Sequence, residues 1–189
     1  MFDLVYPEGP APLIAVKSVR GNTETLPIVD TSGLVTGRST RKACHGNPSL
    51  LHPVVHLHIV NHSGCLYLQK RSESKDLCPG MWDTAVGGHV TYGELLSEAL
   101  VREAAEELSL VDFNPVYMGS YVWRTQLESE LVNIFATVTD RAINPDNSEV
   151  EEGRWWTQDE LSAARGKGIF TPQFEEEYPA MKDRLLALL

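Results

Sequence analysis

The stretch that most constrains this chain runs from Gly87 to Leu110, with the sequence GGHVTYGELLSEALVREAAEELSL. From Glu94 to Asn114 the chain contains neither glycine nor proline and is rich in leucine, alanine and glutamate, which are strong helix formers. We therefore expect a helix over Glu94–Asn114, with Gly93 forming the turn before it.

Three carboxylates meet on one face of this expected helix. Glu103, Glu106 and Glu107 stand at i, i+3 and i+4, and a helix brings such positions together within roughly a 100° arc. Apolar neighbours predict that this face is partly shielded from water, which strengthens the repulsion between the carboxylates. The cluster must therefore take up protons or hold a cation, and its oxygen ligands suit a hard divalent ion such as Mg2+.

Arg102 lies one step around the same helix. Residues four apart on a helix are neighbours, so Arg102 can pair with Glu98 or Glu106 and hold a carboxylate in position. The alternative interpretation is an ordinary solvated helix surface laced with glutamate and arginine, and the spacing alone does not exclude it.

The spacing of this stretch resembles the Nudix signature, which combines two glycines, four glutamates and an arginine at fixed intervals. The matching positions here are Gly88, Glu94, Arg102, Glu103, Ala104, Glu106, Glu107, Ser109 and Leu110. Two of them depart from the signature, because Ala104 replaces a bulkier aliphatic residue and Ser109 replaces the glycine that ends the helix in a left-handed conformation. Neither departure removes a carboxylate. The resemblance implies a metal held by Glu103, Glu106 and Glu107, with the Gly88 carbonyl as a further ligand.

The composition limits the organisation of the chain. A length of 189 residues with 42% hydrophobic content suits one well-buried domain and is short for two. We expect a single domain over residues 1–189, in which 1–23 form an N-terminal extension with at most an edge strand at Leu13–Val16. Apolar runs are too short for a membrane span, and the start lacks the pattern of a signal peptide, which favours the cytoplasm.

The net charge of −10 argues against a nucleic-acid polymer as a partner, because a surface that follows phosphates needs clustered lysine and arginine. Small phosphorylated substrates stay open, since a bridging divalent ion turns an acidic pocket into an anion site. Cys44, Cys65 and Cys78 lie outside CxxC pairs, which predicts free thiols. A homodimer is compatible with the sequence, which does not indicate the oligomeric state.

Alternating apolar patterns and turn residues predict the remaining elements. We expect strands within 24–35, at 52–60, 65–69, 82–86, 116–123, 131–139 and 154–156, and helices at 158–164 and 179–189. The basic segment 38–46 is expected to be a solvated loop. Strands mixed with a few helices predict an α/β fold, a three-layer α/β/α sandwich around a mixed sheet, which the Nudix resemblance also implies.

The strand expected at 52–60 carries three histidines. His52, His56 and His58 share one face by the two-residue period of a strand, whereas the aliphatic residues between them point the other way. We expect His56 and His58 to form a half-buried polar face rather than a site.

From about Glu24 to Leu161 the chain resembles one Nudix branch, type I isopentenyl-diphosphate isomerase and its hydrolase-like relatives. The isomerase holds a metal with three histidines and two glutamates, and the matching positions are His45, His52, His89, Glu128 and Glu130. The resemblance thus implies a second metal site, for which imidazoles with carboxylates suit a transition metal such as Zn2+ or Mn2+. The residues that grip the diphosphate fall on Arg71 and Lys75, although both also fit as solvated residues ending a strand.

Two departures separate this chain from the isomerase. The catalytic cysteine falls on Gly87, which has no side chain to exchange a proton, and a diphosphate-binding arginine falls on Glu103. The resemblance therefore favours a hydrolase that depends on Mg2+ or Mn2+ and cleaves a diphosphate bond in a small, nucleoside diphosphate-linked substrate. Four carboxylates stay open as the group that activates water, namely Glu106, Glu107, Glu128 and Glu130.

Two other functions are compatible with the same residues. An isomerase would need a substitute for the missing cysteine, such as Tyr92 or Cys65. A non-catalytic module that binds a diphosphate is favoured by the Ser109 departure and disfavoured by the intact set of glutamates. The sequence does not name a base, a sugar or a lipid, because specificity in such folds comes from loops around a common site.

Overall fold

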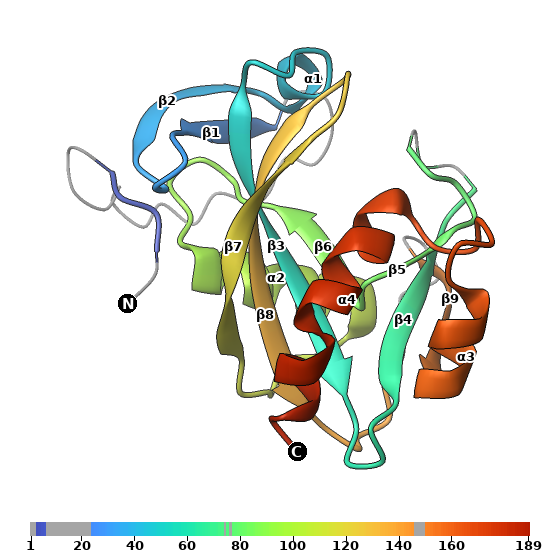
Figure 1. The fold of residues 1–189 in the computed structure, drawn as a ribbon. Helices are drawn as coiled ribbons and strands as arrows, with labels where there is room; N and C mark the ends of the chain where they lie inside the picture. Colours follow the sequence, from blue (N-terminus) through green and yellow to red (C-terminus); the bar gives the residue numbers. More distant parts are fainter. Residues whose placement is uncertain (1–2, 7–23, 74, 76, 146–149) are drawn as a thin grey trace. The chain divides into compact units, whose positions relative to one another are not determined.

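The computed structural model describes residues 3–6 and 24–189, except 74, 76 and 146–149 (Figure 1). The edge strand expected at Leu13–Val16 lies outside these residues. Within the described part of the chain, no helix is both long enough and apolar enough to cross a membrane.

Nine strands and four helices form the described structure. The strands are β1 (Thr25–Val29), β2 (Val35–Thr40), β3 (Leu51–Val60), β4 (Leu66–Arg71), β5 (Trp82–Asp83), β6 (Val86–His89), β7 (Val116–Arg124), β8 (Ser129–Val138) and β9 (Val150–Trp156). The helices are α1 (Arg41–Cys44), α2 (Leu96–Leu108), α3 (Gln158–Ala164) and α4 (Pro172–Leu186). The helix expected at 158–164 is confirmed, as are the strands expected around 52–60, 116–123 and 131–139.

The strands form two sheets. β1 and β2 make a two-stranded sheet, and the larger sheet has the order β5-β4-β3-β8-β7, with β6 paired to β3 and β9 paired to β4. The expected α/β fold with a mixed sheet is confirmed.

The chain divides into two compact units, each built from three stretches. The first unit comprises Met1–Val55, Gly88–Leu100 and Gly119–Asn133, and the second comprises His56–Gly87, Val101–Met118 and Ile134–Leu189. The elements β3, β6, α2, β7 and β8 therefore run through both units. The single domain expected over 1–189 stays a prediction.

The first unit contains the β1–β2 hairpin and the start of α2. The segment expected as a loop at 38–46 is instead the end of β2 and the short helix α1, because Thr40 caps that helix by accepting a hydrogen bond from the Ala43 N–H. The start of α2 is held by the N-terminal residues, since Asp3 Oδ1 accepts from the Leu96 N–H at 2.8 Å. The Tyr6 hydroxyl accepts from the Gly93 N–H, also at 2.8 Å.

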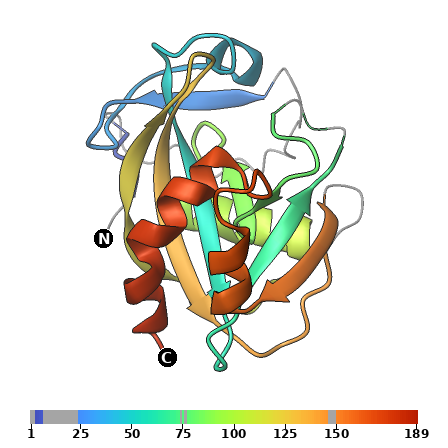
Figure 2. The same cartoon turned by 45° about the vertical axis from the view of Figure 1, so that its right-hand side comes forward.

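The second unit is layered. β4 pairs antiparallel with β9 from Leu66 opposite Trp156 to Arg71 opposite Val150. Figures 1 and 2 show α4 on the near side of the strands of this unit and the α2 segment on the far side. Side chains such as Leu57 and Leu68, which are fully buried, fill the core between these layers.

Two helices differ from the sequence-based expectation. α2 ends at Leu108, six residues before the expected Asn114, because Ser109 has φ of 53° and adopts the left-handed conformation that ends a helix. α4 begins at Pro172 rather than at Pro179, since the Thr171 side chain caps it by accepting from the Phe174 N–H. Pro179 instead lies inside the helix.

Candidate functional site

The carboxylate cluster on α2, formed by Glu103, Glu106 and Glu107, lies in the second unit. Glu103 and Glu107 are buried, and Glu106 is half-buried. Arg102 Nη1 lies 2.6 Å from Glu103 Oε1 and 3.1 Å from Glu106 Oε2, so one guanidinium holds two of the three carboxylates. Arg102 therefore pairs with Glu106, one of the two partners that the spacing allowed, and also with Glu103.

Glu107 is the most strongly perturbed member of the carboxylate cluster. Burial and the charge of Glu103 raise its pKa to about 7, although the Gly87 N–H, Gln69 and Lys75 partly oppose this. Glu107 Oε2 accepts from Gln69 Nε2 at 3.0 Å and from the Gly87 N–H at 3.2 Å. A buried carboxyl beside a second carboxylate gains from a bound cation, so the donor set fits a hard divalent ion.

The two basic residues predicted to grip a diphosphate also lie in the second unit. Lys75 is close enough to lower the pKa of Glu107 through its charge. Arg71 donates from Nε to the Leu77 carbonyl oxygen at 3.1 Å, and its Nη1 lies 3.4 Å from Asp83 Oδ2. Lys75 is thus placed near the carboxylates, whereas Arg71, the last residue of β4, is tied to the loop that follows it. Gly88 belongs to the first unit, and its carbonyl as a metal ligand stays a prediction.

The histidine cluster, which we define as His45, His52, His89, Glu128 and Glu130, lies within the first unit. Its members come from the C-terminal end of α1, from β3, β6 and β8, and from the residue before β8. One ligand atom from each of His45, His52 and His89 lies within 4.8 Å of the others, and the same limit holds for His52, Glu128 and Glu130. The structure therefore brings together all five residues that the isomerase resemblance selected.

His52 is the shared member of both groups. Its side chain is fully buried, and Nδ1 lies 3.3 Å from the Leu50 carbonyl oxygen. Nε2 is buried without a hydrogen-bond partner among the described residues. Burial lowers the pKa of His52, and the charge of Glu130 partly opposes this, so the neutral ring that a metal requires is favoured.

The neighbouring rings of the histidine cluster face one another. His45 Nε2 lies 2.9 Å from His89 Nε2, and His45 Nε2 lies 3.6 Å from Glu128 Oε2. Ligands that share one ion at about 2.0–2.2 Å lie at most about 4.4 Å apart, so the observed spacing needs only small shifts. The donor set of imidazoles and carboxylates fits a transition metal.

The histidines at the other end of β3 correct the sequence-based expectation of a half-buried polar face. His58 is fully buried and His56 nearly so, because Glu177 of α4 covers them. Glu177 Oε2 lies 2.9 Å from His56 Nδ1, and Oε1 lies 2.7 Å from His58 Nε2. Burial alone raises the pKa of Glu177, but the charges and hydrogen bonds of His56 and His58 outweigh it and hold the pKa well below its usual range.

Sequence reasoning missed Glu177 altogether. The available signal was its spacing, because Phe174, Glu177 and Tyr178 stand at i, i+3 and i+4 and all are buried on one face of α4. A glutamate on an apolar helix face needs a buried partner, and the two histidines of β3 supply it.

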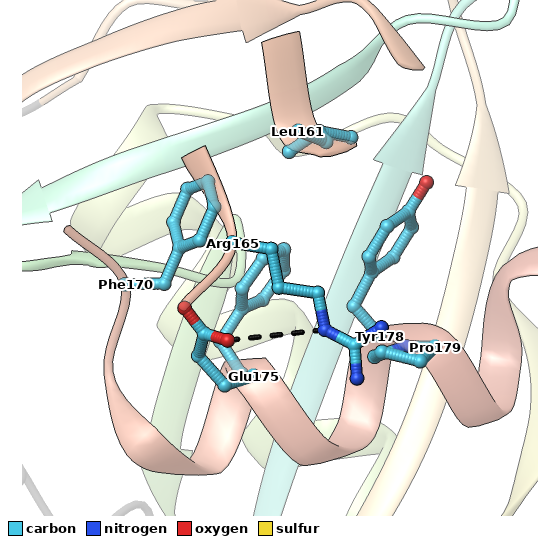
Figure 3. A pocket seen from close by; sticks show the side chains of 7 residues that line it. Leu161, Arg165, Phe170, Glu175, Tyr178 and Pro179 are labelled. Atoms are coloured by element: carbon cyan, nitrogen blue, oxygen red, sulfur yellow. Dashed lines mark ion pairs between the residues drawn. The ribbon is translucent and has the colours of Figure 1, made fainter. Parts of the chain in front are cut away.

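A separate pocket lies between α3 and α4 (Figure 3). It is lined by Leu161, Phe170, Phe174, Tyr178 and Pro179, with Arg165 and Glu175, whose Nε and Oε2 atoms are 3.8 Å apart. None of the residues predicted for a site lines this pocket, so we assign it no part in the chemistry.

Comparison with known proteins shows which family this chain matches. A family model described as NUDIX domain matches residues 50–174. Isopentenyl-diphosphate Delta-isomerase of Escherichia coli O127:H6 is 31% identical over 140 residues, covering 70% of this chain and 76% of that protein. An uncharacterized Nudix hydrolase of Listeria monocytogenes is 30% identical over 143 residues, covering 74% of this chain and 83% of that protein.

Solved structures share the fold. A crystal structure of a Deinococcus radiodurans protein matches with a TM-score of 0.70 and 25% identity, covering 86% of this chain and 99% of that chain. The NUDIX domain of Shewanella oneidensis NrtR, crystallised with ADP ribose, matches with a TM-score of 0.57 and 16% identity, covering 77% of this chain and 92% of that chain.

Proposed function

This chain belongs to the Nudix family, and we propose its function on that basis. Within that family, we propose that it is a hydrolase that depends on Mg2+ or Mn2+ and cleaves a diphosphate bond in a small, nucleoside diphosphate-linked molecule. The observation that carries this proposal is the buried pair of Glu103 and Glu107, in which the pKa of Glu107 is raised to about 7.

The proposed roles follow from the placement of each side chain. Glu103, Glu106 and Glu107 hold the ion, which when bound neutralises the charge that develops on phosphate oxygens. Arg102 holds Glu103 and Glu106 in position through an ion pair to each. Lys75, whose charge acts on Glu107, attracts a phosphate of the substrate, with Arg71 at the end of β4 as the second basic residue.

The substrate class is supported by charge and by one structural relative. A protein with a net charge of −10 binds a small anion most readily through a bridging cation. ADP ribose, present in the Shewanella oneidensis structure, is a nucleoside diphosphate-linked molecule of this class.

The test is a screen of the purified protein against nucleotide sugars, dinucleotides and nucleoside triphosphates with Mg2+ and with Mn2+. We expect turnover of at least one class, and a loss of roughly 100-fold or more in Glu106→Gln and in Glu107→Gln, because each removes a metal ligand. Glu98→Gln is the control, since it removes a carboxylate from the same helix outside the cluster. Equal turnover in wild type and both variants would refute the assignment.

A second candidate is isomerisation of isopentenyl diphosphate, which is favoured by the names of several relatives and by the histidine cluster. We expect no conversion to dimethylallyl diphosphate, because Gly87 stands at the position of the acid–base cysteine. Conversion above the rate without enzyme would reverse the ranking. Binding of diphosphates without any turnover would point instead to a binding module.

We also propose that the histidine cluster holds a second, transition-metal ion such as Zn2+ or Mn2+. The support is the fully buried His52, whose Nε2 has no hydrogen-bond partner in the described part of the chain. Metal analysis of protein purified without chelator, compared with His52→Ala and Glu130→Gln, tests this.

A further inference from the structure

We propose that Gln69 of β4 is a positioning residue of the carboxylate cluster, which makes Glu107 bind its ion through one oxygen only and thereby favours Mg2+ over Ca2+. This inference rests on the proposed function, because it takes Glu107 as a ligand of the ion. It is carried by two hydrogen bonds that converge on the same carboxylate oxygen.

The first observation concerns the two oxygens of Glu107. Oε2 accepts hydrogen bonds from Gln69 Nε2 at 3.0 Å and from the Gly87 N–H at 3.2 Å. Oε1 accepts none from the described residues, and unlike Glu128 Oε2 it is not completely buried. One oxygen of this carboxylate is therefore used by the protein, and the other is open to a ligand.

The number of lone pairs gives this difference a chemical meaning. A carboxylate oxygen has two lone-pair sites, and the two donors occupy both of those on Oε2. An ion that bound Oε2 would have to displace one donor and leave a buried N–H group without an acceptor, which costs free energy. Glu107 is thus prepared to bind a cation through Oε1 alone.

The second observation is that Gln69 is held in place. It lies in β4 between two paired strands, opposite Asp83 of β5 and Gly153 of β9, and its side chain is buried. Asp83 does not compete for the amide, because its Oδ1 accepts from the Thr84 N–H at 2.8 Å and its Oδ2 lies 3.4 Å from Arg71 Nη1. The amide is therefore kept for Glu107.

The direction of the amide follows from its partner. Of its two ends only the NH2 group donates, so contact with a carboxylate oxygen fixes which end of Gln69 faces Glu107. Gln69, Gly87 and Glu107 all belong to the second unit, as do the other two glutamates of the carboxylate cluster. The arrangement thus lies within one compact unit.

The consequence is a preference among hard cations. Ca2+ takes about six to eight oxygen ligands and often binds both oxygens of a carboxylate, whereas Mg2+ takes about six and keeps several waters. A cluster in which one carboxylate offers a single oxygen supplies fewer protein ligands. That supply suits Mg2+, and Gln69 is the side chain that limits it.

Calorimetric titration with Mg2+ and with Ca2+ tests the role without any substrate. Binding that Glu107→Gln removes belongs to the carboxylate cluster, which separates it from ions bound at the histidine cluster. Gln69→Met keeps the length of the side chain but cannot donate. Its affinity for Mg2+ should fall by about 10- to 100-fold, as expected when a residue that orients a ligand is lost. Its affinity for Ca2+ should fall by no more than about threefold, because the freed Oε2 becomes a second ligand for the larger ion.

The matched control is Gln126→Met, the same change at an exposed position of the first unit. It should leave the affinity for both ions as in wild type. Equal losses for Mg2+ and Ca2+ in Gln69→Met would show that the amide only satisfies a buried carboxylate, and would overturn the proposal. An unchanged affinity for Mg2+ would overturn it as well.

A second measurement uses wild type in case Gln69→Met folds poorly. Infrared difference spectra with and without Mg2+ report the two carboxylate stretching bands of Glu107, which are identified by their loss in Glu107→Gln. A carboxylate that binds an ion through one oxygen has these bands further apart than one that binds through both. We expect the wide separation, and the narrow one would contradict binding through Oε1 alone.

These outcomes keep the two proposals apart. If hydrolysis is lost in Glu107→Gln but Gln69→Met binds both ions as wild type does, the proposed function stands and the role of Gln69 falls. If the selectivity changes in Gln69→Met but wild type hydrolyses no diphosphate, the role of Gln69 stands and the proposed function falls. If wild type binds no Mg2+ at the carboxylate cluster, both fall.

Discussion

The two ends of β3 carry the same residue type on the same face of the strand, and the structure treats them differently. His56 and His58, near its C-terminal end, share one buried carboxylate from α4. His52, near its N-terminal end, has a buried Nε2 without a hydrogen-bond partner among the described residues and stands among other imidazoles. The histidines near the C-terminal end thus have a carboxylate partner within the protein. Nε2 of His52, near the N-terminal end, is available to bind a metal ion.

The difference teaches that a histidine acquires its role from what covers it. A buried imidazole with a carboxylate partner has its proton positions fixed, and it can position or exchange protons. Imidazoles and carboxylates whose nitrogen and oxygen atoms gather at one point present more acceptors than donors, which is the chemistry of a metal site. The two-residue period of a strand predicts that His52, His56 and His58 share one face. It does not predict which residues from other elements pack over that face.

The largest expected effect concerns the satisfied end. Glu177→Ala removes the carboxylate that two buried imidazoles share, so the free energy of unfolding should fall by about 3–5 kcal/mol, as expected when one partner of a buried pair is lost. Urea titration measures this. Glu176→Ala on the exposed face of α4 is the control and should change the unfolding free energy by no more than about 0.5 kcal/mol. Similar values for both variants would show that the Glu177 pair is dispensable.

The next effect concerns the incomplete end. Zn2+ or Mn2+ at about 100 times its dissociation constant should raise the free energy of unfolding by about 2.7 kcal/mol, because the ion binds only the folded chain. His52→Ala should abolish this gain. His62→Ala, in which the exposed partner of Asp140 is lost, should keep it. A gain that survives in His52→Ala would place the bound ion elsewhere.

The smallest expected effect is on the pH dependence of stability in metal-free protein, which should differ between the two ends of β3. The pKa of His52 is lowered by burial from 6.5, so the unfolded chain takes up a proton first and stability should fall as pH drops below about 6.5. Burial raises the pKa of Glu177, but His56 and His58 outweigh this and hold that pKa below 4.5. The contribution of Glu177 to the free energy of unfolding is therefore present above pH 4.5 and is lost only at lower pH. Thermal midpoints of wild type and His52→Ala should be measured between pH 7 and pH 3. As pH falls from about 6.5 to 4.5, the midpoint of wild type should fall more steeply than that of His52→Ala. Below pH 4.5 the two midpoints should fall with the same slope.

Much of the carboxylate cluster could be predicted from the sequence because helical spacing is local. Glu103, Glu106 and Glu107 are gathered by one helix, and no distant residue is needed to place them. The histidine cluster is not local, and its five members were selected by resemblance rather than by spacing. The structure brings them together within the first unit.

The features that the sequence did not predict are of two kinds. Some depend on residues far apart in the chain, and others depend on a choice between two positions that fit the same pattern. Glu177 meets His56 across 121 positions, a distance that no periodicity reports. Pro172 and Pro179 both suit a first helical turn, and the cap at Thr171 decides between them. Ser109 ends α2 in a left-handed conformation at the position of the signature glycine, whereas the composition of 94–114 predicts a longer helix.

The cap that Asp3 places on α2 has a consequence for the order of folding. The two residues it joins, Asp3 and Leu96, are 93 positions apart, so the Leu96 N–H gains this partner only when a distant segment arrives, whereas Glu98 satisfies the Leu95 N–H locally. Closing a loop of that length costs roughly 4 kcal/mol of chain entropy, which the contact repays only after the rest of the first unit has formed. The start of α2 should therefore be among the last parts of the chain to become protected from amide hydrogen exchange during refolding.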